Sequence, residues 1–261
     1  MDAYVVVAGC LMAGAAIGFV GGLLGIGGGL LAIPLLGLIF GMSQQAAQGT
    51  ALIMVLPAIL LTVRQYNQHE RIDARAALVA AVSSILCTWM GARIALGVDS
   101  LLLRRIYAVF VLGIAVFYLV QVWRQRGGRS RRKSAPANRP TARHPLWFVP
   151  IGCLGGLVGG IFGIGGAVVA VPLLTSLYGL SQSRAQAFGL AMVIPGSFVA
   201  LLTYARHGQA DWLMGLPLAI GSIALVPHGV RLAYQLPEAR LKLTFACMLL
   251  VIMVLLLLNP Q

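Results

Sequence analysis

The sequence predicts an all-α integral membrane protein made of two homologous helical repeats. Hydrophobic residues make up 59% of its 261 positions and charged residues 10%, and the mean hydropathy of +0.92 lies outside the range of soluble globular domains. Residues 106–122 and 243–258 are apolar on every side, which is typical of membrane-spanning helices. Strands of a membrane barrel are excluded because they would alternate between apolar and polar residues.

A glycine-rich stretch at residues 18–34, GFVGGLLGIGGGLLAIP, recurs at residues 156–172 as GLVGGIFGIGGAVVAVP, which is an offset of 138 residues. One register held over so many positions indicates an internal duplication. The offset also aligns Ser43 with Ser181, Gln48 with Gln186, Pro57 with Pro195, Tyr66 with Tyr204, His69 with His207, Asp73 with Asp211 and Arg93 with Arg231. We therefore divide the chain into a first repeat at 1–123, a linker at 124–144 and a second repeat at 145–261.

The net charge of +13 is concentrated in the linker, which has eight Arg and Lys residues and no acidic residue. Its Gly, Ser and Pro content disfavours a packed structure. By the positive-inside rule the linker is expected on the cytoplasmic side of a cytoplasmic membrane, in a multi-pass protein. Contact of the linker with anionic lipid head groups is an open alternative. This location of the charge argues against a nucleic-acid partner.

In the first repeat, a helix over residues 4–24 is long enough to cross about 30 Å of hydrocarbon. Glycines at 25 and 27–29 interrupt it, and the following segment, residues 30–40 with Pro34, is too short to cross and predicts a short or re-entrant half-helix. Ser43 is a suitable N-cap for the next helix. The remaining predicted elements are a helix over 44–66, a polar loop over 67–73 and spans over 74–96 and 101–123.

The second repeat is expected to follow the same order: a helix over 145–162, a break at 163–166, a half-helix over 167–178, a helix over 182–206 and spans over 212–236 and 239–258. If the short element counts as a crossing, the repeats are inverted, and if it does not, they are parallel. Both termini lack Lys and Arg while the linker is rich in them. This favours termini outside, the linker inside and inverted repeats.

The repeated glycine break carries the main functional hypothesis. A half-helix that begins inside the membrane presents unsatisfied N–H groups and the positive end of its dipole, so two such termini can hold a small anion without a fixed cation. Polar neutral side chains of the next helix can complete the site. The predicted substrate-binding residues are Gly25, Gly27, Gly28, Gly29, Gln48, Thr50, Gly163, Gly165, Gly166, Ser181 and Gln186, and the predicted hinge residues are Pro34, Pro57, Pro172 and Pro195.

Other interpretations of these residues were weighed. The glycines could serve only close helix packing, with the glutamines bridging helices. A dinucleotide-binding loop is excluded, because no strand precedes the glycines and no acidic residue follows at the required distance. Without a Ser-His, Cys-His or HExxH arrangement, we expect no enzymatic activity, and we expect no metal and no cofactor.

The remaining ionisable residues have simple explanations. Arg93 and Arg231 lie about one turn from the ends of their helices, where long side chains snorkel, although a gate for an anion is the alternative. His69 and His207 are expected near loops, with proton coupling as the alternative. Four isolated cysteines, Cys10, Cys87, Cys153 and Cys247, are expected to be structural thiols.

The duplicated GGxxGxGGG…P break, followed by the segment AQGTAL at residues 47–52 and the helix proline Pro57, resembles the TauE/SafE family of membrane permeases. The resemblance covers nearly the whole chain except the linker. The second repeat has Ala187 and Phe188 where the first has Gly49 and Thr50, which leaves open whether both halves contribute equal ligands.

The resemblance implies a transporter, in the direction of export, for small anions such as sulfite or organosulfonates. The alternative is a channel-like or sulfur-relay membrane protein that passes a sulfur anion to a partner, and a third class is a purely structural membrane scaffold. The expected partners are the small anionic substrate, the lipid bilayer and, as a homodimer, a second copy of the chain.

Overall fold

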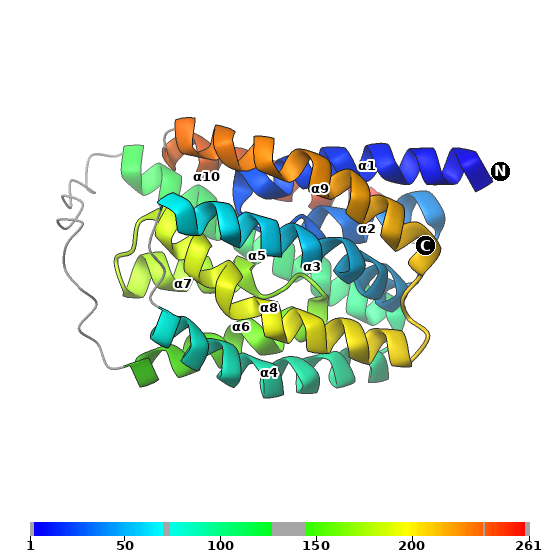
Figure 1. Cartoon of the computed structure of the whole chain (residues 1–261), viewed down its shortest axis with the longest axis horizontal. Coiled ribbons are helices and arrows are strands. Elements are labelled where there is room, and N and C mark those ends of the chain that lie inside the picture. Colours follow the sequence, from blue (N-terminus) through cyan, green and yellow to red (C-terminus); the bar gives the residue numbers. More distant parts are fainter. Residues whose placement is uncertain (1–2, 70–73, 127–144, 237, 259–261) are drawn as a thin grey trace.

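The computed structural model describes residues 3–69, 74–126, 145–236 and 238–258, and the described residues contain ten α-helices, one short 3-10 helix and no strand (Figure 1). Most of the predicted linker and part of the predicted loop at 67–73 lie outside the described residues. The helices of the first repeat are α1 (Ala3–Leu24), α2 (Gly29–Phe40), α3 (Gln44–His69), α4 (Ala74–Gly97) and α5 (Ser100–Arg126). Those of the second repeat are η1 (Pro145–Phe148), α6 (Val149–Phe162), α7 (Ala167–Leu177), α8 (Gln182–Arg206), α9 (Trp212–Gln235) and α10 (Glu238–Leu258).

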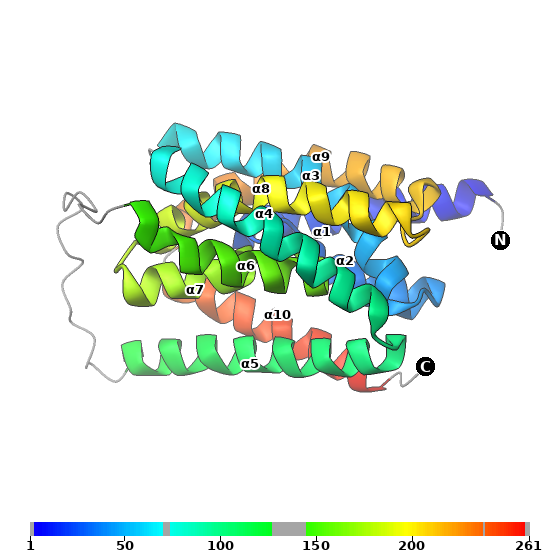
Figure 2. The same ribbon diagram turned by 90° about the horizontal axis from the view of Figure 1, so that it is seen from below.

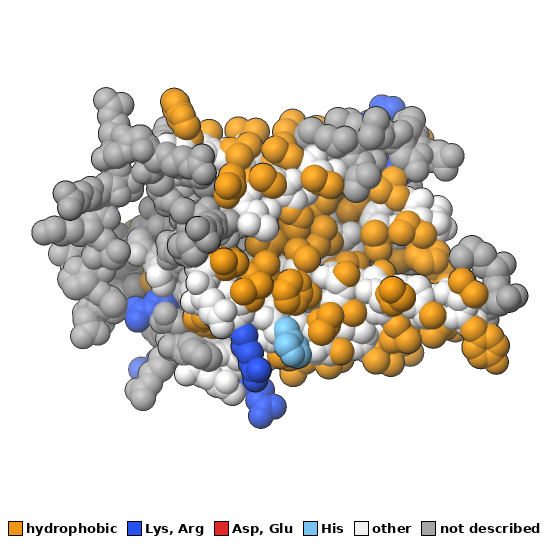
Figure 3. Space-filling view, turned by 90° about the horizontal axis from the view of Figure 1, so that it is seen from above, with side chains coloured by type: hydrophobic (Ala, Val, Ile, Leu, Met, Phe, Trp, Pro, Cys, Tyr) orange, Lys and Arg blue, Asp and Glu red, His pale blue; other side chains and the backbone are white. Residues whose placement is uncertain are grey.

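Six helices in the described part of the chain are long and apolar enough to cross a membrane: Tyr4–Leu24, Gln44–Gln68, Arg75–Gly97, Ser100–Gln121, Gln182–Arg206 and Trp212–Gln235. Their outer surfaces expose large apolar side chains such as Leu78, Val109 and Ile220. Figure 3 shows apolar side chains over much of the middle of one face of the bundle. Exposure of so much apolar surface to water would be unfavourable. The fold is therefore that of an all-α integral membrane protein, as predicted.

The predicted span over 145–162 is not a single long helix. Regular α-helix begins only at Val149, after the 3-10 turn of η1, and α6 has 14 residues. Pro150 lies in its first turn, where a missing backbone N–H removes no helical hydrogen bond. At 1.5 Å per residue α6 reaches about 21 Å, which is too short to cross the hydrocarbon core.

The half-helix α7 folds back along α6. A Cβ atom added at Gly159 would lie 2.7 Å from the nitrogen of Gly166, and one added at Gly155 would approach Ala170. Because the contact residues have lower numbers on α6 as they have higher numbers on α7, the two helices form an antiparallel hairpin. The break glycines form the turn of this hairpin, and only residues without a Cβ allow the two backbones to approach so closely.

Helices pair across the repeats rather than within them. Gly14, Gly18 and Gly22 of α1 face the backbone at Leu218, Ser222 and Val226 of α9, and the equivalent Gly152, Gly156 and Gly160 of α6 face Ala80, Ser84 and Thr88 of α4. The contacts advance in step, so each pair of helices runs parallel. Each repeat therefore contributes one helix to the outer layer of the other.

The equivalent helices α3 and α8 run antiparallel at the centre of the molecule. Gln48, near the start of α3, is hydrogen-bonded to Tyr204 near the end of α8, and Gln186, near the start of α8, is hydrogen-bonded to Tyr66 near the end of α3. In Figure 2, α1 begins and α10 ends at one end of the bundle, whereas α5 ends and α6 begins at the opposite end. The two glycine breaks thus meet between α3 and α8.

Candidate functional site

Each glycine break has the same backbone conformation. Gly25, Gly27 and Gly28 have φ values of 63°, 71° and 81°, and the equivalent Gly163, Gly165 and Gly166 have values of 66°, 75° and 71°. Residues with a Cβ rarely adopt this left-handed region. Gly28 and Gly166 are the N-caps of α2 and α7. The predicted half-helices therefore begin inside the bundle, at the glycines that the sequence indicated.

A glutamine from each repeat covers the glycine break of the other. A Cβ atom added at Gly25 would lie 2.6 Å from Cδ of Gln186, and one added at Gly163 would lie 2.8 Å from Cβ of Gln48. Both glutamines are buried. The predicted substrate residues Gln48 and Gln186 are therefore brought to the breaks, each to that of the opposite half.

The two glutamines differ in their hydrogen bonds. Gln186 is held at both ends of its amide, because Nε2 donates to the carbonyl oxygen of Leu24 at 2.7 Å and Oε1 accepts from the hydroxyl of Tyr66 at 3.0 Å. Gln48 accepts from the hydroxyl of Tyr204 at 2.8 Å, but its Nε2 has no partner within the described part of the chain. One polar atom of this buried amide is therefore available to another group.

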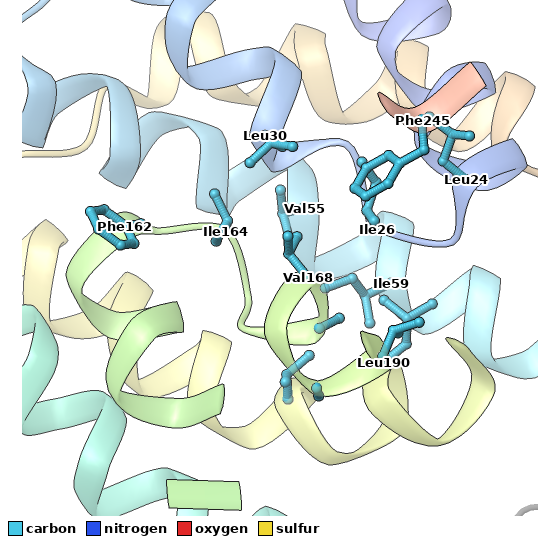
Figure 4. Packing of buried hydrophobic residues seen from close by; sticks show 14 of the residues in the cluster. Leu24, Ile26, Leu30, Val55, Ile59, Phe162, Ile164, Val168, Leu190 and Phe245 are labelled. Carbon is cyan, nitrogen blue, oxygen red and sulfur yellow. The ribbon is translucent and has the colours of Figure 1, made fainter. Parts of the chain in front are cut away.

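The two breaks touch each other through apolar residues. A Cβ at Gly29 would lie 3.4 Å from Cα of Ile164, and Ile59 of α3 contacts both Gly27 and Gly165. Ile26 and Ile164, the central residues of the two breaks, are buried, and Figure 4 shows Ile164 close to Leu30 and Val55. The centre of the molecule is therefore closed by aliphatic side chains in this conformation.

A small cavity lies beside the second break. About 160 Å³ there is not filled by atoms, but the space is too narrow in this conformation to admit a water molecule, and it is lined by Thr88, Gly156, Gly159, Gly165, Val193 and Ser197. The hydroxyl of Ser197 is buried and has no hydrogen-bond partner among the residues described. The cavity therefore brings the positive end of α7 together with a free hydroxyl group.

Two predicted substrate residues are engaged elsewhere. The hydroxyl of Thr50 accepts from the backbone N–H of Asp211 at 2.9 Å, on the connection between α8 and α9. Ser181 is the N-cap of α8 and accepts from the backbone N–H of Arg184 at 3.4 Å. Their hydroxyl groups fix the ends of helices, as does Ser43 at the start of α3, which was predicted to be an N-cap.

The predicted gate residues face outward. Arg93 is exposed, and its guanidinium lies 5.3 Å from the ring centroid of Trp89, while Arg231 is exposed on α9. This placement agrees with the first explanation, that long side chains near helix ends snorkel, rather than with the alternative of a gate. The four predicted hinge residues, Pro34, Pro57, Pro172 and Pro195, all lie inside helices.

Sequence reasoning missed several residues of the site. Tyr66 and Tyr204 were aligned by the repeat, yet nothing in the sequence showed that their hydroxyls bind the glutamines. Ser197 was missed because its partner in the repeat is Ile59, so no duplicated pattern marks it. Cys87 and Cys153, expected to be isolated, lie close enough for their thiols to form a hydrogen bond. No group of three or more His, Cys, Asp or Glu residues that could hold a metal occurs in the described ranges.

Known proteins match the chain over almost its whole length. The family model "Sulfite exporter TauE/SafE" matches residues 10–256. A "Probable membrane transporter protein" of Xylella fastidiosa (strain Temecula1) is 28% identical over 230 residues, which cover 87% of this chain and 85% of the relative. A protein of the same description from Methanocaldococcus jannaschii is 23% identical, covering 83% of this chain and 79% of its own length. No solved structure matches the chain significantly.

Proposed function

We propose, because this chain belongs to the sulfite exporter TauE/SafE family of membrane transporters, that it exports a small sulfur oxyanion such as sulfite or an organosulfonate across the cytoplasmic membrane. The family match and the transporter relatives support the transport of a solute, and the substrate class is our proposal. The single observation that carries it is the meeting of two half-helix N-termini inside an apolar bundle, each covered by a glutamine of the other repeat.

These N-termini suit an anion better than a cation. The first N–H groups of a helix lack an intrahelical acceptor, and the helix dipole places partial positive charge at the same point. Within a bilayer the low dielectric constant strengthens this attraction. A site of N–H, amide and hydroxyl groups stabilises an oxyanion through hydrogen bonds, yet without a fixed cation it can also release the ion.

We further propose an inverted arrangement of the two repeats in the membrane. The antiparallel course of α3 and α8 supports it. In this arrangement the first two helices of each repeat form a hairpin that enters and leaves on one side, and the other three helices cross. An odd number of crossings places both termini outside and the basic linker inside, in agreement with the positive-inside rule.

The conformation described above then corresponds to a closed state. Ile164 lies in the apolar contact between the breaks, close to Leu30 and Val55, so passage requires this contact to open. One repeat rocking against the other would open it first to one side and then to the other, with bending at Pro57 and Pro195 in the central helices.

Ligand-dependent thermal stability of the detergent-purified protein tests the proposal, with sulfite, sulfate, thiosulfate, sulfoacetate, taurine, acetate and chloride as probes. A ligand at 100 times its Kd stabilises the folded state by about 2.7 kcal/mol. We expect a sulfur oxyanion to raise the melting temperature selectively and to be transported into liposomes. Absence of both effects for every sulfur anion would contradict the proposed substrate class, whereas downhill, uncoupled flux would favour a channel or relay.

A further inference from the structure

Two hydroxyl side chains beside the second glycine break have no counterpart beside the first. Ser197 of α8 and Thr88 of α4 line the small cavity next to Gly165. At the repeat offset of 138 residues, Ser197 of the second repeat is equivalent to Ile59 of the first, and Thr88 of the first repeat is equivalent to Val226 of the second. The duplicated architecture is therefore polar at this point beside one break and aliphatic beside the other.

Ser197 is the most unusual of these residues. Its side chain is 2% exposed, and its Oγ has no hydrogen-bond partner in the described portion of the chain. A Cβ atom added at Gly165 would lie 3.2 Å from this Oγ, so the hydroxyl is directed at the break itself. Buried polar groups are nearly always paired, and a buried hydroxyl without a partner therefore requires an explanation.

The cavity that Ser197 faces also lies at the N-terminus of α7. This helix has 11 residues and begins after Gly166, whose carbonyl oxygen accepts from the N–H groups of Val169 and Ala170. The N–H groups of Ala167 and Val168 precede these donors and have no acceptor within the helix. Gly165, which lines the cavity, directly precedes the N-cap Gly166, so the cavity adjoins the positive end of the α7 dipole and contains a free hydroxyl group.

The corresponding space in the first half is occupied by carbon atoms. A Cβ added at Gly27 would lie 2.7 Å from Cγ1 of Ile59, and one added at Gly165 would lie 3.3 Å from its Cδ1, so this side chain packs more closely on the first break than on the second. In addition, the amide of Gln186 is fully hydrogen-bonded there, whereas Gln48 at the second break has a free Nε2. The residue pairs Ser197/Ile59 and Thr88/Val226 and the two glutamine amides thus all make the second break the more polar of the two.

We propose that, once the closed contact between the breaks opens, the anion is bound asymmetrically, with its oxygen atoms held at the second break by Ser197, Thr88 and the first N–H groups of α7, while the first break acts as an apolar wall. This inference rests on the proposed function and specifies where the oxyanion lies. The ligand class is a small oxyanion, sulfite or the sulfonate head of an organosulfonate, which accepts several hydrogen bonds from neutral donors at once.

The test compares Ser197→Ala with Ser222→Ala in the full-length protein. Ser222 is a matched control, because it is also buried and its Oγ also has no partner among the described residues. It lies on α9 facing Gly18 of α1 and does not line the cavity. The Kd for sulfite is measured from thermal stabilisation, and uptake of sulfite into liposomes is measured in parallel. Ser197→Thr keeps a hydroxyl group and serves as the conservative variant.

We expect Ser197→Ala to weaken sulfite binding roughly tenfold, because one hydrogen bond to a charged ligand is lost, with Ser222→Ala and Ser197→Thr staying within about threefold of the wild type. Equal affinity in Ser197→Ala and wild type, while the wild type still transports sulfite, would overturn the asymmetric site and leave the proposed function standing. A wild type that neither binds nor transports any sulfur oxyanion would overturn both.

Discussion

The two glycine breaks share a backbone but differ in what surrounds them. At the first break, Gln186 is bonded at both ends of its amide and Ile59 packs on the glycines. At the second, Gln48 keeps a free amide nitrogen, and the unpaired hydroxyl of Ser197 faces a cavity. Duplication thus preserved the backbone turn at both breaks, whereas these free polar groups, one from each repeat, lie at the second break.

This difference separates the role of the glycines in the backbone turn from the role of the polar side chains in binding, which the repeated sequence pattern did not distinguish. The left-handed glycines are required wherever a half-helix must begin inside the bundle, so both halves keep them. Polar side chains are costly in an apolar interior and are retained only where they are paired or used. Changes to the glycines should therefore affect both halves alike, and changes to the polar groups should not.

Substitution of the break glycines should cause the largest loss. In Gly25→Ala and Gly163→Ala a left-handed backbone costs about 1–2 kcal/mol, and the new methyl group also displaces Gln186 or Gln48. We expect both variants to lose roughly 2 kcal/mol or more of stability, measured as a lower melting temperature. Gly113→Ala is the control, since a Cβ there meets no atom within 4 Å. Tolerance of one substitution alone would show that the halves do not share this requirement.

Removal of the glutamine amides should distinguish the two halves. Gln186→Leu leaves both the Leu24 carbonyl and the Tyr66 hydroxyl without this partner, so we expect about 2 kcal/mol of destabilisation. Gln48→Leu should cost about 1 kcal/mol or less, because the Tyr204 hydroxyl also lies 3.0 Å from the carbonyl of Gly160.

The effects of the two glutamines on ligand affinity should follow the opposite order. We expect sulfite affinity, measured from thermal stabilisation, to fall more in Gln48→Leu than in Gln186→Leu, since only Gln48 has a free amide group. Equal losses of stability and of affinity in the two variants would contradict the division of roles between the breaks.

Exchange of the residue types at the equivalent positions Thr88 and Val226 should have the smallest effect on sulfite affinity. Thr88→Val removes a hydroxyl from the cavity at nearly constant volume, and we expect sulfite affinity to fall about threefold. Val226→Thr places a hydroxyl at the equivalent position beside the first break, where transport should stay unchanged. Liposome uptake measures both, and a gain of affinity in Val226→Thr would indicate that the first break also binds the anion.

Helix positions followed closely from the sequence. The predicted helix over 182–206 matches α8 at both ends, because Ser181 caps its start and Gly208, just beyond its end, adopts a left-handed conformation. The break glycines were found through their repetition. The predicted helix over 145–162 also has the observed bounds, but its first turn is the 3-10 helix η1, so regular α-helix begins only at Val149, with Pro150 in its first turn.

The partners of the site residues could not be predicted. Gln48 and Tyr204 are 156 residues apart, and their pairing depends on the antiparallel course of α3 and α8, which the sequence left open. Ser197 could not be identified from the duplication either, because the equivalent residue is Ile59 and a repeated pattern marks only the residues that both halves share. Helices that are apolar on every side also give no sign of which neighbour they will contact.

The cross-repeat pairing of helices has a consequence for biosynthesis. Gly18 of α1 packs against Ser222 of α9, so α1 enters the membrane long before its partner has left the ribosome. Until the second repeat has been inserted, the glycines of α1 contact lipid or the translocation machinery. By contrast, α4 is already in the membrane when α6 is made. Packing of α1 is therefore delayed until α9 has been made, and a ribosome that stops after the first repeat leaves a product that cannot complete its own outer layer.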